Sequence, residues 1–200
     1  MNGNRKSKTT NAAMPSASDR LCDGDLHKLL AAAPADIRAL IRFGILTGLR
    51  SRELTELRKD DCVLDGVVQP YVQVEHHKTS RSARPPESHT APLCPDAHEI
   101  LKTQAGIHPA SEFVFLDSRG APYTQRSFKN RLARLCKTVG LSRACTPSCL
   151  RRTYACIMLD TGVEITTLSR LMGHTTTRTM ERYVSNIPIR NRHRKGVSGL

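Results

Sequence analysis

The stretch Leu171-Met172-Gly173-His174, with Tyr183 nine residues further on, is the most informative part of this sequence for its fold and its function. It joins an apolar helix end, a glycine turn, a histidine and an isolated tyrosine. Upstream, Thr146–Ala155 predicts a helix that opens on a proline and carries two adjacent arginines. Further back, Thr47–Leu54 places an arginine just after a glycine. Arginines, a histidine and a tyrosine from three separate segments suit a reaction at a phosphodiester.

The chain is strongly basic, which narrows the class of partner. Its 200 residues suffice for one domain with a sizeable core. Lysine and arginine number 31 against 18 acidic residues, which gives a net charge of +13. Such a surplus favours a polyanionic partner, most economically nucleic acid, over an uninvolved basic surface. We therefore expect a nucleic acid, DNA or RNA, as the partner, although charge alone indicates no chemistry.

Several protein classes are disfavoured by composition. No apolar run approaches the roughly 20 residues that span a bilayer, and residues 1–18 are polar and lack the apolar stretch of a signal peptide. The seven cysteines form no Cys-x-x-Cys pair, which is typical of reduced, cytoplasmic thiols. Cys145 and Cys149 have histidines nearby but no second ligand pair at a zinc spacing. We expect a cytoplasmic protein without metal, cofactor or membrane contact.

The first part of the chain has helical periodicity. Apolar residues recur at helical spacing over about 23–33 and 35–46, and again from Glu53 to Leu57. Thr47-Gly48 interrupts this pattern. Arg50 is therefore expected at a helix–helix corner, where a side chain is held rigidly yet can point out of the core.

The middle of the chain alternates with period two. Residues 63–64, 71–75 and 90–93 predict three short strands of an antiparallel sheet. The connection from His76 to His89 is long, basic and contains prolines, and Lys78 stands near its start. Loops of this length in compact domains are usually functional or mobile.

The last part is helical again. We expect a helix from about Pro95, a short buried stretch at 113–115, a turn at 120–122, and helices over about 124–139, 147–160, 163–171 and 176–185. The helix over 124–139 has one apolar side, with Arg126, Lys129, Arg131, Arg134 and Lys137 on the others. Such a helix can lean on phosphates, and a merely solvated charged face is the equal alternative.

Metal-free cutting of a DNA strand requires a small set of groups, and this chain has a candidate residue for every role. Tyr183 offers a nucleophile whose phosphoester keeps the bond energy for rejoining. Arg50 and Arg151 offer guanidinium forks for the charged non-bridging oxygens. His174 can donate a further hydrogen bond or move a proton, and Lys78 can protonate the departing 5′-oxygen. Singly, each residue has an ordinary explanation as core filler, solvated cation or helix cap; only the joint pattern indicates a site.

That joint pattern resembles the tyrosine recombinases, the phage-integrase family. Thr47–Arg50 resembles the family's first arginine box, and Thr146–Arg151 its second. Leu171–His174 followed by Tyr183 resembles the third box, including the His–Tyr spacing. Lys78-Thr79 after a predicted strand is similar to the family's strand-loop lysine. The resemblance covers about residues 20–187.

The resemblance implies an α+β fold that is mainly α-helical, with a small three-stranded antiparallel sheet. It implies site-specific DNA recombination or integration through a 3′-phosphotyrosyl intermediate formed by Tyr183. Arg50, Arg151 and His174 would hold the scissile phosphate, and Lys78 would be the general acid. A homo-oligomer on DNA, or a partner recombinase, and a bacterial cytoplasm or mobile element are implied by the resemblance alone. The domains expected are an arm (1–19), a catalytic domain (20–187) and a basic tail (188–200).

Two departures from the family pattern leave alternatives open. Ser148 stands where the second box usually has histidine, and a hydroxyl is no useful acid or base near neutral pH. The hydroxyl can still hydrogen-bond a phosphate oxygen, and the neighbouring Arg152 could compensate in part, although its side chain is expected to point elsewhere. We therefore expect a slower enzyme before a dead one. Only about twenty residues precede the first predicted helix, whereas family members commonly carry a separate DNA-clamping domain there. The alternatives are a weak or inactive DNA-binding relative that modulates a full-length recombinase, and single-strand cutting and resealing of the type IB topoisomerase kind.

Overall fold

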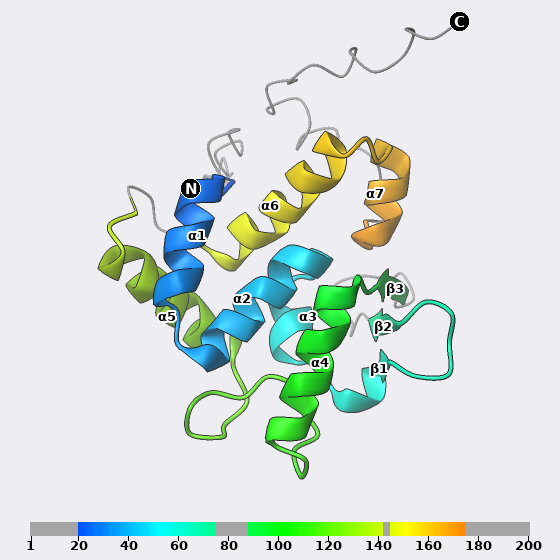
Figure 1. Cartoon of the computed structure of the whole chain (residues 1–200), viewed down its shortest axis with the longest axis horizontal. Coiled ribbons are helices and arrows are strands. Elements are labelled where there is room, and N and C mark those ends of the chain that lie inside the picture. The colour runs from blue at the N-terminus through cyan, green and yellow to red at the C-terminus, as the bar shows by residue number, and fades with distance from the viewer. Residues whose placement is uncertain (1–19, 75–87, 142–144, 175–200) are drawn as a thin grey trace, which may run out of the picture.

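A computed structural model of the chain describes residues 20–74, 88–141 and 145–174. Its elements are, in order, α1 (Asp23–Ala32), α2 (Ala35–Thr47), α3 (Ser51–Thr55), η2 (Lys59–Asp61), β1 (Cys62–Val63), β2 (Tyr71–Val74), β3 (His89–Pro92), α4 (Pro95–Ile107), α5 (Gln125–Thr138), α6 (Pro147–Asp160) and α7 (Ile165–Leu171) (Figure 1). The predicted fold class, mainly helical with three short strands, is confirmed. The helix expected near 176–185 and most of the long 76–89 connection lie outside the described residues.

Helix α2 is the element around which the others pack. Its buried side chains recur at helical spacing, and the helix contacts α1, α4, α5 and α6. At its end Gly48 adopts the left-handed conformation, with φ 65°, and its N–H donates to the carbonyl of Gly44 at 3.0 Å. A left-handed residue at this position ends a helix without strain only when it is glycine. The chain therefore turns sharply into Arg50, the N-cap of α3, at the predicted helix–helix corner.

The three strands form one antiparallel sheet in the order β1-β2-β3. Val72 pairs with Ala91 and Val74 with His89. Val72, Val74 and Ala91 are buried in the core, while Tyr71 and Gln73 on the other side of β2 are only half-buried, which explains the period of two in the sequence. The sheet lies on the side of the molecule away from α1 and α5, and α7 packs against β3 (Figure 1).

Helix α5 is the basic helix expected over 124–139, and it begins with a capping box formed by Thr124 and Ser127. One of its cations differs from the expectation. Arg131 does not belong to the open basic face, because its guanidinium donates to the carboxylate of Asp36 on α2 and to the hydroxyl of Tyr123. Burial favours the neutral acid at Asp36, yet hydrogen bonds from Arg131 and Tyr123 hold its pKa below the usual value. Arg131 thus fixes α5 to α2.

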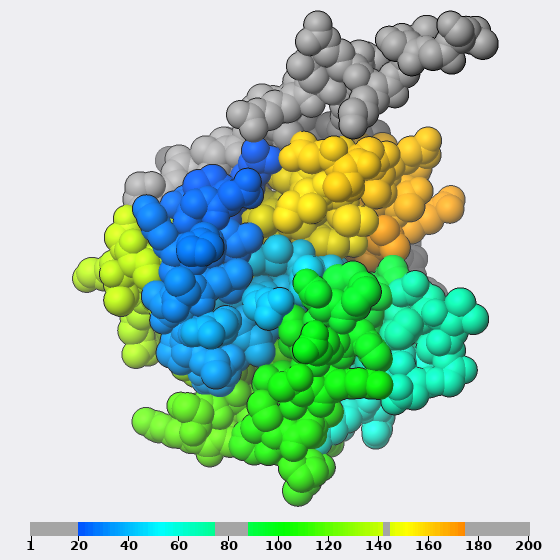
Figure 2. Space-filling view, viewed as in Figure 1, coloured from blue at the N-terminus to red at the C-terminus, as the bar shows by residue number. Residues whose placement is uncertain are grey.

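The apolar interior has two parts. The larger cluster is built around α2 and includes Leu40, Phe43 and Phe115. The smaller cluster lies between α6 and α7 and consists of Tyr154, Ala155, Leu159, Leu168 and Met172. Figure 2 shows α6 and α7 together at one end of the molecule, next to the sheet. Within the residues described, no helix has the length and apolarity that crossing a membrane would require.

Candidate active site

Arg50 is held where α2 gives way to α3. Its backbone N–H and its guanidinium Nη1 both donate to the carboxylate of Glu53, each at 2.7 Å. Its Nη2 donates to the carbonyl oxygen of Gly173 at 2.7 Å, across 123 residues of sequence. The Arg50 side chain is 37% exposed, whereas that of Glu53 is only 7% exposed. The buried carboxylate of Glu53 therefore fixes the orientation of the half-exposed guanidinium of Arg50.

The pKa of Glu53 fits this role. Burial would raise it, but the backbone and side-chain hydrogen bonds from Arg50, together with the charges of Arg50 and Arg151, hold it below the usual value. Glu53 is thus a carboxylate throughout the physiological range, and the pair with Arg50 is charge-assisted.

Arg151 reaches the same place from α6. It is only 6% exposed, and the cost of burying its charge is met by backbone acceptors. Its Nη1 donates to the carbonyl of Gly48 at 2.6 Å, and its Nη2 to the carbonyl of Met172. Nη2 also lies 3.1 Å from Nε2 of His174. Arg151 therefore links the ends of α2 and α7.

His174 follows a tight turn at the end of α7. Gly173 has φ 60°, and the backbone N–H of His174 donates to the carbonyl of Ser169 at 2.9 Å. Burial, together with the charges of Arg151 and Arg50, lowers the pKa of His174 to about 4. The ring is therefore neutral near pH 7. Since a guanidinium is always a donor, Nε2 of His174 accepts from Arg151 in the free protein.

The structure brings three of the six residues expected in the site together: Arg50, Arg151 and His174 meet at the turn after α7. Ser148 lies in the first turn of α6, three residues before Arg151, and is exposed. Lys78 and Tyr183 lie outside the described residues. Arg152 is the next residue of α6 after Arg151, and its charge favours the thiolate forms of Cys149 and Cys156.

Two residues of the site were not expected to act in it. Glu53 could have been recognised, because an acidic residue three positions after a helix N-cap commonly accepts the N-cap N–H. No feature of the sequence indicated that His89 lies at the site. It opens β3, and a methyl group added at Gly173 would lie only 2.5 Å from its Nδ1, so its ring packs directly on the turn that carries His174.

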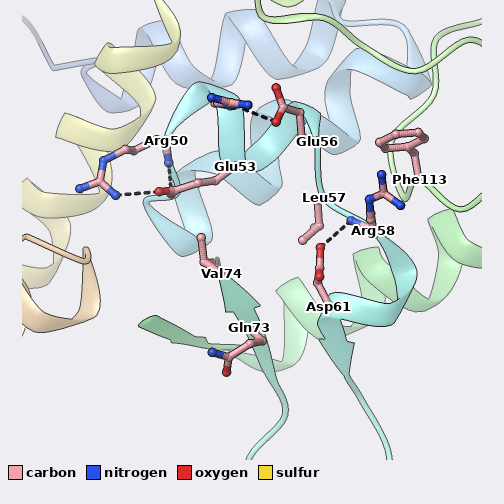
Figure 3. A pocket seen from close by; sticks show the side chains of 10 residues that line it. Arg50, Glu53, Glu56, Leu57, Arg58, Asp61, Gln73, Val74 and Phe113 are labelled. Carbon is pink, nitrogen blue, oxygen red and sulfur yellow. Dashed lines mark hydrogen bonds and ion pairs between the residues drawn. The ribbon is translucent and has the colours of Figure 1, made fainter. Parts of the chain in front are cut away.

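A groove of about 520 Å³ opens beside Arg50, between α3, η2 and β2 (Figure 3). Arg50 and Glu53 line one side of it, and Gln73 and Val74 of β2 the other. Figure 3 shows the Arg50 guanidinium extending from α3 toward α6 and α7. In the described part of the chain, no group of three or more His, Cys, Asp or Glu residues is arranged to hold a metal ion.

Sequence comparison identifies relatives over most of the chain. Residues 20–188 match the model of the phage integrase family. Tyrosine recombinase XerD of Listeria innocua is 26% identical over 166 residues, which cover 80% of this chain and 55% of the relative. Tyrosine recombinase XerC of Bacillus pumilus is 31% identical over 141 residues, covering 68% and 45%. The chain thus spans about half the length of these relatives.

Solved structures share the fold. The XerA recombinase superposes with a TM-score of 0.68 at 22% identity, covering 86% of this chain and 60% of that one. A lambda integrase tetramer bound to a Holliday junction gives 0.65 at 23% identity, covering 82% and 47%. The likeness to these structures shows that the chain has the same fold. The match of residues 20–188 to the family model shows that the chain belongs to the phage integrase family.

Proposed function

We propose that this chain cuts and rejoins DNA at specific sites through a 3′-phosphotyrosyl intermediate, as the catalytic unit of a recombinase. The observation that carries the proposal is the meeting of Arg50, Arg151 and His174, from three distant segments, at one turn of the backbone. Arg50 and Arg151 donate to the neighbouring carbonyls of Gly173 and Met172, so two guanidinium groups lie beside one turn. Positive charge fixed at one place is suited to stabilising a dianionic transition state.

In this proposal each described residue has one role. Arg50 and Arg151 bind the non-bridging oxygens of the scissile phosphate. His174 adds a hydrogen bond to the same phosphate. A bound phosphate would offset the two arginine charges that contribute to the low pKa of His174, so a larger fraction of the ring is protonated when substrate is present. Glu53 is a positioning residue, because it acts through Arg50.

Tyr183 and Lys78 are proposed from their connections to this site. Tyr183 follows His174 by nine residues and would attack phosphorus, while the 5′-oxygen leaves with a proton from Lys78. The segment that carries Lys78 leaves the sheet after Val74, which lines the groove beside Arg50. It rejoins the sheet at His89, against the turn after α7. Both ends of this segment therefore flank the arginines.

The wider setting is proposed on the same basis. Residues 20–187 would form the catalytic domain, in agreement with the matched range 20–188, with an arm (1–19) and a basic tail (188–200). Double-stranded DNA would be the substrate, bound by a homo-oligomer or together with a partner recombinase in the cytoplasm. Structural neighbours include an integrase of the transposon Tn1549 in complex with DNA, which supports a mobile element as the setting.

A second candidate function is a DNA-binding relative with weak or no cleavage. Ser148 favours it: an exposed hydroxyl stands one helical turn before Arg151, and it is not a useful general acid or base near neutral pH. Losing one aligned transition-state contact typically costs on the order of 10²–10³ in rate.

A suicide-substrate assay tests the proposal. Nicked duplexes carrying candidate sites, including the sequences that flank the gene, are mixed with the full chain, and a denaturant-resistant protein–DNA band is sought. Tyr183→Phe should abolish the band, whereas Tyr71→Phe, which removes the hydroxyl of a half-buried strand residue, should keep it. Ser148→His should strengthen it. Absence of the band on DNA that the protein demonstrably binds would leave the DNA-binding relative, and relaxation of supercoils without strand exchange would indicate topoisomerase-like resealing.

A further inference from the structure

Three cysteine thiols gather where α5 ends and α6 begins, outside the candidate active site. Cys136 lies in the last turn of α5, Cys145 just before α6, and Cys149 in the first turn of α6. Cys136 and Cys145 are buried, and Cys149 is half-buried. Sγ of Cys145 donates to the carbonyl of Thr146 at 3.5 Å, and Sγ of Cys149 lies 3.4 Å from the N of the same residue, so both thiols are held against Thr146. All three are reduced in this structure.

The surroundings of Cys149 stabilise its thiolate. The hydrogen bond from Cys145 lowers the pKa of Cys149 to about 5, with the Thr146 hydroxyl, the Thr146 N–H and the charge of Arg152 acting in the same direction against burial. Sγ of Cys149 lies 3.4 Å from both the N and the Oγ1 of Thr146. A thiol at a helix N-terminus with such partners is the kind that reacts as a nucleophile.

The neighbouring thiol has the opposite character. Hydrogen bonding to Cys136 and Cys149, together with burial, raises the pKa of Cys145, which keeps its proton. A half-exposed thiolate and a buried, protonated thiol held by the same residue have the arrangement of an attacking and a resolving cysteine.

We propose that Cys149 and Cys145 form an oxidisable pair that closes a disulfide at the start of α6. The Cys149 thiolate attacks hydrogen peroxide, the O–O bond breaks and hydroxide leaves, so that the sulfur is oxidised to a sulfenic acid. Sγ of Cys145 then attacks that sulfur, the S–O bond breaks, and the hydroxyl leaves as water with the proton of Cys145. Two thiols and one peroxide thus give one disulfide and two waters.

The disulfide would change the structure of the candidate active site. Sγ of Cys149 accepts a hydrogen bond from the backbone N–H of Thr146, and forming the disulfide would break this bond. The first turn of α6, the helix that carries Ser148 and Arg151, would then change. Misplacement of a catalytic group by about 1 Å can cost on the order of 10² in rate. Oxidation is therefore expected to lower DNA cleavage about 10²-fold and dithiothreitol to restore it, a consequence that rests on the function proposed above.

Mass spectrometry tests the pair without any need for DNA. Trypsin cleavage after Arg143 and Arg151 leaves both thiols in the peptide 144–151, and Cys136 in another. After treatment of the full chain with hydrogen peroxide and trapping of the remaining thiols, peptide 144–151 should have lost two hydrogens and taken up no alkylating reagent. A cross-link between 144–151 and the Cys136 peptide, or irreversible oxidation of single thiols, would overturn the proposal.

Two controls isolate the cause. Cys94 is the N-cap of α4, another helix that begins with proline, and its side chain makes no capping hydrogen bond. Cys94→Ser should leave disulfide formation unchanged, whereas Cys149→Ser abolishes it. Cys62 is half-buried like Cys149, but burial and the charge of Asp61 raise its pKa to about 12. In a short iodoacetamide pulse near pH 6, Cys149 should therefore label at least about 100-fold faster than Cys62. Equal labelling would overturn the proposal.

Measuring DNA cleavage by the reduced and the oxidised protein distinguishes the proposed recombinase function from the proposed thiol pair. A disulfide that forms while neither the reduced nor the oxidised protein cleaves DNA would contradict the recombinase function and leave the thiol pair standing. Cleavage that survives peroxide with the disulfide demonstrably closed would overturn its effect on α6.

Discussion

Replacing Gly48 by alanine should destabilise the fold and the site together, and its cost can be worked out in two parts. The backbone there has φ 65°, which costs an alanine about 1–2 kcal/mol. The added methyl would lie 2.3 Å from Cδ1 of Tyr154, far inside ordinary contact distance. Displacing a buried ring typically costs about 1–3 kcal/mol. We therefore expect Gly48→Ala to lower the free energy of unfolding by about 2–5 kcal/mol.

Gly140→Ala is the matched control, because it isolates the first part. Gly140 has φ 68°, but a methyl group added there would meet nothing within 4 Å. This variant should lose only about 1–2 kcal/mol. Urea unfolding of both variants at 25 °C, with unchanged m-values, measures the difference. In a double-mutant cycle, Tyr154→Ala should remove part of the penalty of Gly48→Ala, because the ring that the methyl meets is then gone.

Activity gives the same prediction a second readout. The carbonyl of Gly48 accepts from Nη1 of Arg151 at 2.6 Å, so a shift of this corner moves an arginine of the site. DNA cleavage should fall in Gly48→Ala at temperatures where the variant is still folded, and should stay unchanged in Gly140→Ala. Equal losses of stability in the two variants would refute the reasoning, since the contact with Tyr154 would then contribute nothing.

Three further predictions follow from the hydrogen bonds and pKa shifts. Glu53→Gln removes the charge that aims Arg50, and cleavage should fall by about 10²-fold in the suicide-substrate assay while DNA binding changes little. His174 protonates near pH 4 when folded but near 6.5 when unfolded, so the unfolded chain binds more protons between these values. The free energy of unfolding should therefore decrease as pH falls from 6.5 toward 4, and His174→Gln should flatten that slope in urea titrations. Asp36→Asn breaks the tie between α2 and α5 and should cost about 1–3 kcal/mol, whereas Asn in place of the fully exposed Asp65 should change stability little.

Much of the fold follows from periodicity because each element has a half-buried face. The apolar spacing of α2 and α5 and the alternation in β2 are physical consequences of one side packing on the core. The ends of elements were also predictable where glycine or proline stands, as at Gly48 and before α6. The ends of β1 and β3 differ by one residue from the expectation; β3, for example, begins at His89 where Thr90 was expected.

The site was predictable only in part, because contacts between distant segments leave no local pattern. The resemblance to the family's sequence boxes predicted that Arg50 and Arg151 lie in one site. The backbone carbonyls that hold them could not be predicted from the sequence. Arg131 shows the reverse case. Its position on a basic helix predicted a solvated or phosphate-facing cation, but its pairing with Asp36 depends on how α5 lies on α2.

The division of the interior into two apolar clusters has a consequence for hydrogen exchange. Amides of α2 are buried in the larger cluster and should exchange only through global unfolding, whereas α7 rests on the few side chains of the smaller one. Helix α7 should therefore open as a separate cooperative unit at a lower free energy. The arginine hydrogen bonds to Met172 and Gly173 cross the boundary between these units, so the group that would hold the phosphate also sets how readily the histidine-bearing turn detaches.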